Sequence, residues 1–341
     1  MALLGLIGGC ATSPPPVDEY LVVVPGHVQD SRDRFRDIYC AVLEARRNTL
    51  PYYLPCEEAL SPVHDSPAAT GRPVDLGASA RKLEAAVVPG IGFSCFANWL
   101  QPPQTVAAHL QQFGYDQTHI EVDALSGSDT NARQIRDAIL AMAVHEPPRL
   151  VLVGYSKGTP DILEAIVNYP EIRGHIAAVV SIAGAVGGSP LANDARQWQA
   201  DLLKYWPDSE CDSGDGNAVA SLRPDDRRAW LAENPLPKNI RYYSVVTLPL
   251  PERISRVVAP SYRKLGAIDW RNDSQLIYAD EFIPGSTLLA FINADHWAVA
   301  VPVNSAHPKI ASLFVDQNQY PREALLEAVM RFVEEDLESR W

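Results

Sequence analysis

The pattern of apolar and polar positions from Leu83 onward predicts alternating strands and helices. Short apolar runs that end at turn residues are typical of strands, and they occupy residues 84–90, 119–125, 150–153, 175–185 and 239–248. Apolar positions recur at helical spacing in residues 105–115, 131–146 and 159–171. The run 150–153 is continuously apolar, as expected for a central strand buried on both faces. The alternation predicts an α/β fold with a mostly parallel central sheet and helices on both faces.

Two other segments have less regular patterns. Before Leu83, the sequence predicts a strand over residues 19–28, a helix over 31–47 and a loop over 61–77. Between two predicted strands, residues 187–238 are too long for a plain connection and contain several aromatic residues among many charges. We interpret residues 187–238 as a cap inserted into one large domain.

Residues 1–19 are interpreted as a signal-like segment and tether outside this domain, which then spans residues 20–341. Their apolar stretch is too short to cross a bilayer and is followed by a proline-rich tether. The stretch Ile7-Gly8-Gly9-Cys10 resembles the lipobox of bacterial lipoproteins, in which the cysteine becomes the lipidated first residue. This resemblance implies an exported protein, periplasmic or anchored to a membrane through a lipid on Cys10. A disordered N-terminus is the alternative.

Four cysteines remain besides Cys10, and an even number suits disulfides in an oxidising compartment. We expect Cys40 to pair with Cys56, because both flank one helix-and-loop unit. Cys95 and Cys211 then pair by elimination, and four free buried thiols are the alternative. No cluster of cysteine and histidine has zinc spacing, so we expect no structural metal.

The charge of the chain limits its partners. The formal net charge of −13 argues against nucleic acid and anionic lipid, because both would be repelled at neutral pH. The composition, 47% hydrophobic and 21% charged, is typical of a soluble globular protein. Neutral or cationic ligands fit this charge better.

Ser156 is the first candidate for chemistry, because it lies between Gly154 and Gly158 directly after a predicted buried strand. In the pattern G-x-S-x-G, the serine sits on a sharp turn from strand to helix, where flanking side chains would collide with their neighbours. The turn places the serine hydroxyl at a helix N-terminus, whose partial positive charge favours an anionic transition state. The strand before the motif and the helix after it supply the required context.

Two backbone amides are candidates for an oxyanion hole beside Ser156. The N–H of Lys157, the residue after the nucleophile, is one. The N–H of Ile91 is the other, because Gly90 after a predicted strand lets the backbone approach closely. The loop in residues 22–28 is the rival for this second donor. The Lys157 ammonium itself is not required, so we expect it to be solvated or paired locally.

The base and the acid must follow the serine in the chain in this topology. His296 follows an apolar strand and precedes another apolar run, which favours it over His175 and His307. Asp273 lies in a turn sequence after the strand 239–248, and its carboxylate can point inward there. The rival acids are Asp269, Asp280 and Asp295.

Taken together, these motifs resemble the α/β-hydrolase superfamily, and within it bacterial lipases and carboxylesterases. "VVPGIG" stands at the oxyanion loop, "LVGYSKG" at the nucleophile, "NDSQLI" at the acid and "ADHWAV" at the histidine. The resemblance covers residues 83–341. Pro89 replaces the usual histidine before the oxyanion glycine, and Ala185 with Val186 replaces a Pro-His pair.

The resemblance implies a serine hydrolase that cleaves a small-molecule or lipid ester through an acyl-enzyme and needs no cofactor. The inserted cap would cover the acyl site as a lid does, and a purely structural excursion is the alternative. An acyltransferase that uses the same acyl-enzyme is the second hypothesis. A non-catalytic binding protein on the same fold is the third.

Overall fold

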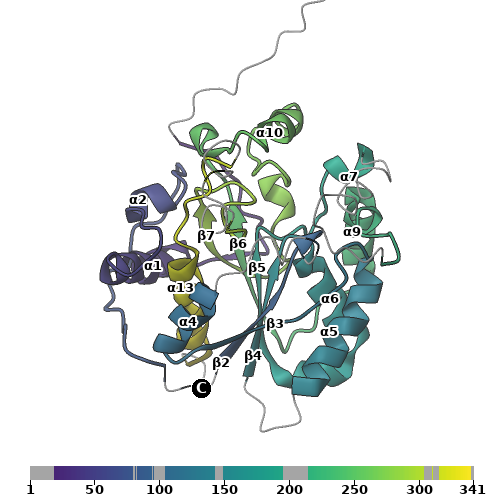
Figure 1. The fold of residues 1–341 in the computed structure, drawn as a ribbon, viewed down its shortest axis with the longest axis horizontal. Helices are drawn as coiled ribbons and strands as arrows, with labels where there is room; N and C mark the ends of the chain where they lie inside the picture. Colours follow the sequence, from purple (N-terminus) through teal and green to yellow (C-terminus); the bar gives the residue numbers. More distant parts are fainter. Residues whose placement is uncertain are drawn as a thin grey trace, which may run out of the picture.

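The computed structural model describes residues 19–79, 81, 83–93, 95, 104–142, 149–194, 214–302, 309 and 315–338. Within these residues, seven strands form one all-parallel sheet in the order β1-β7-β6-β5-β4-β2-β3 (Figure 1). The strands are β1 (Gln29–Asp30), β2 (Leu83–Val88), β3 (Asp116–His119), β4 (Arg149–Tyr155), β5 (Ile176–Ile182), β6 (Arg241–Thr247) and β7 (Thr287–Ile292). The predicted parallel sheet is confirmed.

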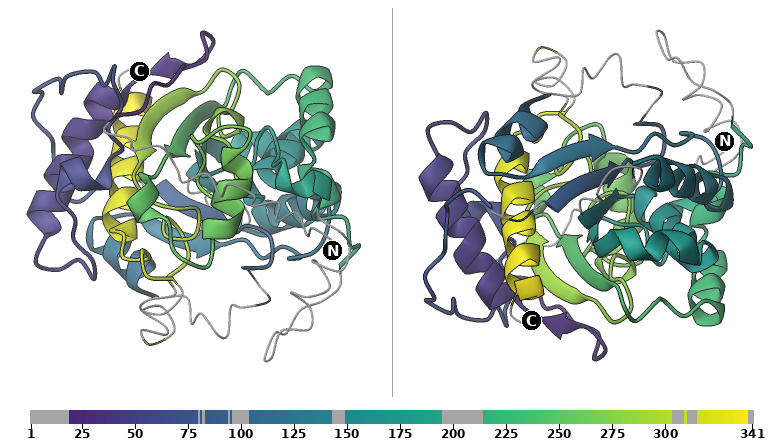
Figure 2. Two further views of the ribbon diagram at one scale, coloured as in Figure 1. Left: turned by 90° about the horizontal axis from the view of Figure 1, so that it is seen from above. Right: turned by 90° about the horizontal axis from the view of Figure 1, so that it is seen from below.

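Helices cover both faces of the sheet, as predicted (Figures 1 and 2). One face carries α1 (Arg32–Arg46), α4 (Gln104–Gln112) and α13 (Arg322–Glu338). The other carries α5 (Ser128–Met142) and α6 (Gly158–Asn168). The shorter elements are α2 (Cys56–Ala59), η1 (Pro170–His175), α7 (Leu191–Asp194), η2 (Ala220–Leu222), α9 (Pro224–Glu233), η3 (Pro251–Arg253), α10 (Ala259–Gly266) and η4 (Tyr278–Asp280).

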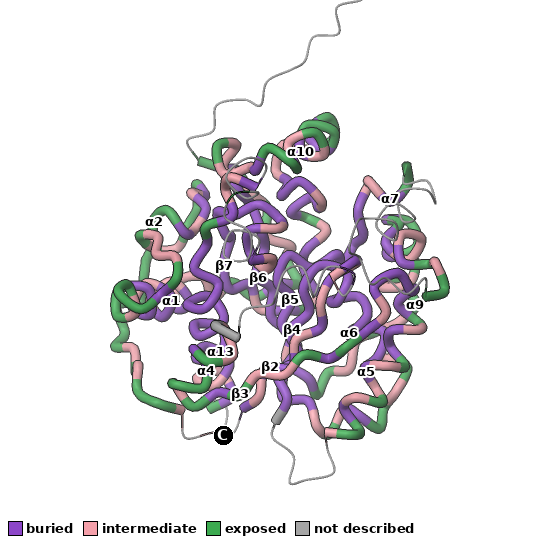
Figure 3. The backbone as a smooth tube through the Cα atoms, in the orientation of Figure 1, coloured by how far each residue is buried: buried purple, intermediate pink, exposed green. Residues whose placement is uncertain are grey.

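Strand β4 lies in the middle of the sheet, between β2 and β5, and is buried on both faces (Figure 3). Its side chains alternate between two cores because successive residues of a strand point to opposite faces. Val151 and Val153 pack in the core under α1 and α13, whereas Leu150 and Leu152 pack in the core under α5 and α6. Both cores therefore fix the position of the residue that follows β4.

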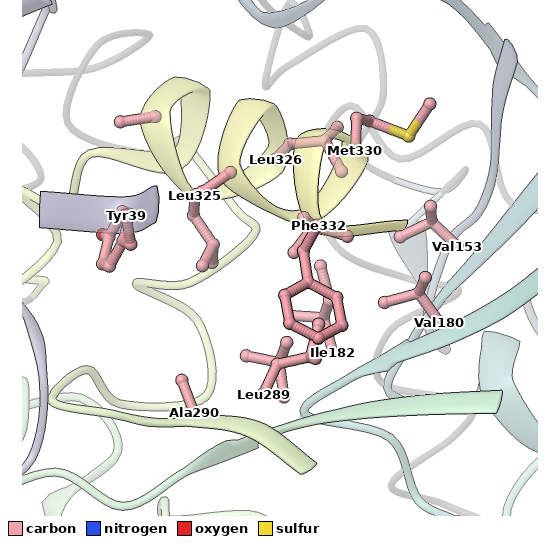
Figure 4. Packing of buried hydrophobic residues seen from close by; sticks show 14 of the residues in the cluster. Tyr39, Val153, Val180, Ile182, Leu289, Ala290, Leu325, Leu326, Met330 and Phe332 are labelled. Atoms are coloured by element: carbon pink, nitrogen blue, oxygen red, sulfur yellow. The ribbon is translucent and has the colours of Figure 1, made fainter. Parts of the chain in front are cut away.

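The long helix α13 anchors the first of these cores. Figure 4 shows Leu325, Met330 and Phe332 of α13 packed toward the sheet residues Val153 and Leu289. The N-terminal helix α1 joins the same core, and Arg34 forms an ion pair of 2.6 Å with Glu335 on α13. The segment before β2 is therefore part of the same folded body as the sheet.

A disulfide joins Cys40 on α1 to Cys56 at the start of α2, which is the pair favoured from the sequence. Cys95 is also disulfide-bonded. Its expected partner, Cys211, lies outside the described residues, as does Cys10 with the lipobox-like segment. No helix in the described part of the chain is long and apolar enough to cross a membrane.

Two predicted strands were wrong. The strand expected over 119–125 is β3, at Asp116–His119, and the apolar residues after it leave the sheet. Ile120 and Val122 are buried without continuing the strand, and the side-chain oxygen of Gln134 on α5 accepts the N–H of Asp123. Their apolar character reflects burial in the core under α5, and it carries no information about strand pairing.

Residues 19–28 also form no strand. Their only bridge within the described residues joins Tyr20 to Val63, and Val23 is 72% exposed. The short β1 begins at Gln29 instead, after the turn at Pro25 and Gly26. Valine-rich composition favours a strand only where a partner strand is available on the sheet edge.

The segment predicted as an inserted cap contains α7, η2 and α9, and its residues 195–213 lie outside the described part. The C-terminal part of the segment packs on the body of the protein. Trp230 and Leu236 contact the core under α5 and α6. Figure 1 shows α7 and α9 on the same side of the sheet as α6.

Candidate active site

Ser156 lies on a sharp turn between β4 and α6. Its backbone φ is +53°, a conformation that a non-glycine residue rarely adopts. The flanking glycines leave no room for a side chain. A Cβ on Gly154 would lie 2.6 Å from Cα of Thr159, and one on Gly158 would lie 2.2 Å from the carbonyl oxygen of Val88. The serine is thus held at the carboxyl edge of the sheet, 7% exposed.

His296 lies within hydrogen-bond distance of Ser156. It follows β7, and its Nε2 is 2.9 Å from Oγ of Ser156. Its other ring nitrogen, Nδ1, is 2.6 Å from Oδ2 of Asp273. The Tyr155 hydroxyl donates to the carbonyl oxygen of His296 at 2.6 Å, and burial raises the pKa of Tyr155 well above its usual range. The phenol therefore keeps its proton and holds the histidine loop in place.

Asp273 is fully buried in a turn after β6 and α10. Its Oδ1 accepts the backbone N–H groups of Gln275 and Leu276 at 2.9 and 2.7 Å. Its carbonyl oxygen accepts the N–H of His296 at 2.9 Å, so the acid turn and the histidine loop are tied together by backbone as well. The turn is tight, because Ser274 has φ +86°.

The rival acids lie elsewhere and have other partners. Asp269 pairs with Arg271 at 2.7 Å. Asp280 lies 3.7 Å from Arg228. Asp295 accepts backbone N–H groups of its own loop and of Ser255.

The rival histidines do not join this group either. His175 lies at the end of η1, at the start of β5, and thus at the opposite edge of the sheet from Ser156. His307 lies outside the described residues.

The two predicted oxyanion amides lie in segments that meet at Ser156. Gly90 lies in the loop after β2 and approaches the serine closely. A Cβ on Gly90 would lie 2.8 Å from Cβ of Ser156. The N–H groups of Ile91 and Lys157 donate to no other group in the described part of the chain. In the rival loop, a Cβ on Gly26 would meet nothing within 4 Å.

The Lys157 side chain is buried and locally paired, and it is not solvated. Its Nζ lies 2.7 and 2.8 Å from the two carboxylate oxygens of Asp161, one turn along α6. The amide of Asn131 on α5 donates to the same carboxylate at 2.7 Å. The ammonium therefore faces the interior between α5 and α6.

An apolar cavity of about 150 Å³ lies on the α13 side of the sheet. Three of its lining residues are close in sequence to the groups just described: Tyr155 precedes Ser156, Val299 follows His296, and Phe93 follows Ile91. Ile182 and Leu326 line its apolar wall. This position and lining suit the hydrocarbon part of a small molecule.

Sequence reasoning missed two polar residues behind Asp273. The Thr247 hydroxyl, at the end of β6, is 2.6 Å from Oδ2 of Asp273. Glu281 is fully buried, and its Oε2 accepts the N–H of Thr247 at 2.8 Å. A threonine that ends an apolar strand was the only local signal. Glu281 stands between Asp280 and Phe282, where an acid usually marks the surface.

No protein-family model matches the sequence, and no curated protein is significantly similar to it. Solved structures do match. The metagenomic carboxyl esterase MGS0156 is 37% identical, with a TM-score of 0.85, and the match covers 96% of this chain and 97% of that one. The mature lipase BlEst2 of Bacillus licheniformis is 19% identical, with a TM-score of 0.54 over 71% of this chain and 96% of that one.

The likeness to the esterase extends over nearly the whole chain, including the segment before β2 that the sequence motifs did not cover. The lipase, at its lower identity, shows the fold alone. The chain belongs to the α/β-hydrolase superfamily and is a carboxylic ester hydrolase. Within the described residues, no group of three or more histidine, cysteine, aspartate or glutamate side chains could hold a metal ion.

Proposed function

We propose that this protein hydrolyses carboxylic esters with Ser156 as nucleophile, His296 as general base and Asp273 as the acid that orients the imidazole. One observation carries the proposal: a continuous line of hydrogen bonds runs from Oγ of Ser156 through both ring nitrogens of His296 to Oδ2 of Asp273. All three side chains are buried, so water competes little with these contacts.

In the first half of the reaction, Oγ of Ser156 attacks the ester carbonyl carbon while Nε2 of His296 takes the hydroxyl proton. The carbonyl oxygen becomes an oxyanion, which the N–H groups of Ile91 and Lys157 stabilise. Loss of one such donor costs about 2.7–4 kcal/mol in the transition state. The tetrahedral intermediate collapses, His296 returns the proton to the leaving alkoxide, and an acyl-enzyme remains.

In the second half, water takes the place of the alcohol. His296 removes a proton from the water as it attacks the acyl-enzyme, and the same two amides hold the second oxyanion. Collapse releases the carboxylic acid, and the proton passes back to Oγ of Ser156. Asp273 stays ionised throughout and stabilises the imidazolium that forms in each half.

The apolar cavity beside Tyr155 and Val299 is the proposed site for the hydrocarbon part of the ester. Ala300 lines this cavity, and replacement by leucine reduces its volume. We expect A300L to lower kcat/KM for p-nitrophenyl esters more as the acyl chain lengthens. The exposed Ala45 on α1 gives the matched control, A45L, which should leave the chain-length profile unchanged. Equal losses at every length would contradict this assignment. The segment 187–238 remains our proposal for a lid.

A fluorophosphonate probe tests the reactive centre directly. We expect the folded wild-type protein to be labelled once, and we expect labelling to be lost in S156A and H296A. The exposed residues Ser66 and His64 give matched controls, S66A and H64A, that should label normally. Labelling that persists in S156A would refute the proposed nucleophile.

We also propose that the protein is exported and lipidated at Cys10. The disulfide between Cys40 and Cys56 supports an oxidising compartment. Metabolic labelling with a fatty-acid analogue in a bacterial host should mark the wild-type chain and leave C10S unmarked. Equal labelling of both, or of neither, would rule out lipidation at this position.

A further inference from the structure

Glu281 is a buried carboxyl group behind the acid of the proposed triad. It follows η4 and is 0% exposed. Its Oε2 accepts the N–H of Thr247 at 2.8 Å and lies 3.0 Å from the hydroxyl oxygen of the same threonine. Its other oxygen, Oε1, is buried without a hydrogen-bond partner. An ionised carboxylate in this position would leave part of its charge unsolvated.

The protons around Thr247 can be counted. Asp273 receives four donors: Nδ1 of His296, the Thr247 hydroxyl and two backbone amides. Four donors fill the acceptor sites of an ionised carboxylate. The Thr247 hydroxyl has a single proton, and its contact with Asp273, at 2.6 Å, is the shorter of its two carboxyl contacts. That proton therefore goes to Asp273, and the contact with Glu281 needs a proton from Glu281.

The charges around Glu281 favour the neutral acid. The groups that face it are the carboxyls of Asp273 and Asp280 and the phenol of Tyr155. In the described part of the chain, no lysine or arginine lies within ion-pair distance of Glu281. Burial raises the pKa of Glu281 well above its usual range, and the negative charge of Asp273 raises this pKa further.

We propose that Glu281 is held as a neutral carboxylic acid that donates to the Thr247 hydroxyl, which in turn donates to Asp273. This inference deepens the proposed function and rests on it for its catalytic consequence. Glu281 and Thr247 are positioning residues: they fix Asp273 from behind. Because Glu281 carries no charge, His296 faces one carboxylate and not two.

A carboxylic acid suits this position better than an amide. Oε2 of a protonated Glu281 accepts the N–H of Thr247 and donates its own proton to the hydroxyl of Thr247. One atom of a glutamine side chain can accept or donate, but it cannot do both. The variant E281Q is therefore neutral, like the proposed wild type, but loses one of the two contacts.

The protonation state can be measured without any assay of activity. Infrared difference spectra between wild type and E281Q at pH 8 should contain the carbonyl band of a protonated carboxylic acid. The variant E327Q is the matched control, because Glu327 is also buried but is paired with Arg331 at 2.8 Å. Glutamate labelled with ¹³C should shift the band in the wild-type protein, so the result does not depend on a variant that folds. A spectrum with carboxylate bands alone would overturn the proposal.

Kinetics test the positioning role. We expect E281Q to lower kcat about tenfold with little change in KM, and to leave the acidic limb of the kcat/KM profile in place. If Glu281 were ionised, E281Q would remove a negative charge near His296, and the acidic limb would move to lower pH. That shift would contradict the proposal even if the variant were active.

A double-mutant cycle tests the route through Thr247. T247V should lower kcat about as much as E281Q, and T247S should restore it because the hydroxyl returns. The double variant T247V/E281Q should be no slower than T247V, because Glu281 acts only through that hydroxyl. Additive losses would refute the route. Failure of this route and failure of the proposed nucleophile are distinguishable: fluorophosphonate labelling that persists in S156A contradicts the nucleophile, whereas additive losses with S156A unlabelled contradict the route alone.

Discussion

Two pairs of buried carboxyl groups, one on α6 and one after β6, differ in whether a lysine or arginine lies beside them. On α6, Asp161 pairs with Lys157, and Glu164 pairs with Arg227 at 2.9 Å. After β6, Asp273 and Glu281 have no lysine or arginine partner within the described residues. Each carboxyl group on α6 therefore has a cation of the protein beside it.

This difference determines which carboxylate can stabilise a positive charge that forms during the proposed reaction. A buried carboxylate with a fixed cation is already neutralised and can contribute little to a charge that appears only in the transition state. Asp273 lies beside the imidazole of His296 instead. In the proposed mechanism, that imidazole becomes positive only when His296 accepts the serine proton. The carboxylate of Asp273 stabilises this imidazolium. A second carboxylate at Glu281 would repel the carboxylate of Asp273, and a protonated Glu281 avoids this repulsion.

The largest effect should come from Asp273, where the charge is used. In D273N the side-chain amide cannot accept the Nδ1 proton as the carboxylate does, so the imidazole adopts the wrong tautomer. We expect kcat to fall about 10⁴-fold. Steady-state hydrolysis of a saturating p-nitrophenyl ester gives kcat. D269N is the control, because Asp269 is paired with Arg271 outside the site, and it should retain nearly full activity. A loss below tenfold in D273N would remove Asp273 from the triad.

The corresponding change on α6 should affect stability. K157M leaves Asp161 buried with only the Asn131 amide as a side-chain partner. Loss of one partner of a buried pair costs about 3–5 kcal/mol of unfolding free energy. Urea unfolding measures this value, and the double variant K157M/D161L should recover most of it. The exposed pair of Lys264 with Asp194 gives the control K264M, which should change the unfolding free energy little. Equal losses in K157M and K264M would show that burial does not matter here.

The next largest expected effect is on how the unfolding free energy depends on pH. Glu281 keeps its proton in the folded state above the pH at which the unfolded chain loses it, because its folded pKa is raised. Wild-type stability therefore falls as pH rises above about 4.5, and a neutral glutamine does not share this loss. The unfolding free energy of E281Q relative to wild type should rise with pH above the unfolded pKa of glutamate, by at most about 1.4 kcal/mol per pH unit, until the folded pKa of Glu281 is reached. The exposed control E44Q should show no such slope, and parallel curves for E281Q would exclude a raised pKa.

Features that depend on neighbouring residues could be predicted from the sequence, whereas features that depend on distant segments could not. The i,i+4 spacing of Lys157 and Asp161 on a predicted helix is a local signal, and local pairing was one of the two outcomes expected for Lys157, beside solvation. Ser156 was predictable for the same reason, since its strand, glycines and helix are contiguous. His296 and Asp273 required the topology of a known superfamily, because they lie more than 100 residues from the serine.

Glu281 and Thr247 had no comparable signal. Glu281 is 34 residues from Thr247, and its burial depends on how the loop after η4 packs against the end of β6. The misplaced strand at residues 119–125 has a related cause. Ile120 and Val122 are apolar because they fill a core, and the sequence does not state which element supplies the neighbours. Contacts between distant segments determine all of these features.

The smallest expected effect is the pH dependence of stability when Glu164 loses its partner Arg227. Burial raises the pKa of Glu164 to about 7 in the folded protein, despite the nearby Arg227. Below pH 7 the wild-type carboxyl is already mostly protonated, so removal of the Arg227 charge costs little there. Above pH 7, R227M must keep Glu164 protonated or bury its charge without a cation. The charge-dependent destabilisation should therefore be absent at pH 6 and reach about 1.4 kcal/mol at pH 8.

Any loss of packing by Arg227 adds a constant at both pH values. R47M, which breaks the exposed pair of Arg47 with Glu44, should lack this increase. If R227M were destabilised equally at both pH values, Glu164 would be permanently ionised. The pair on α6 would then be a conventional buried ion pair that does not titrate near neutral pH.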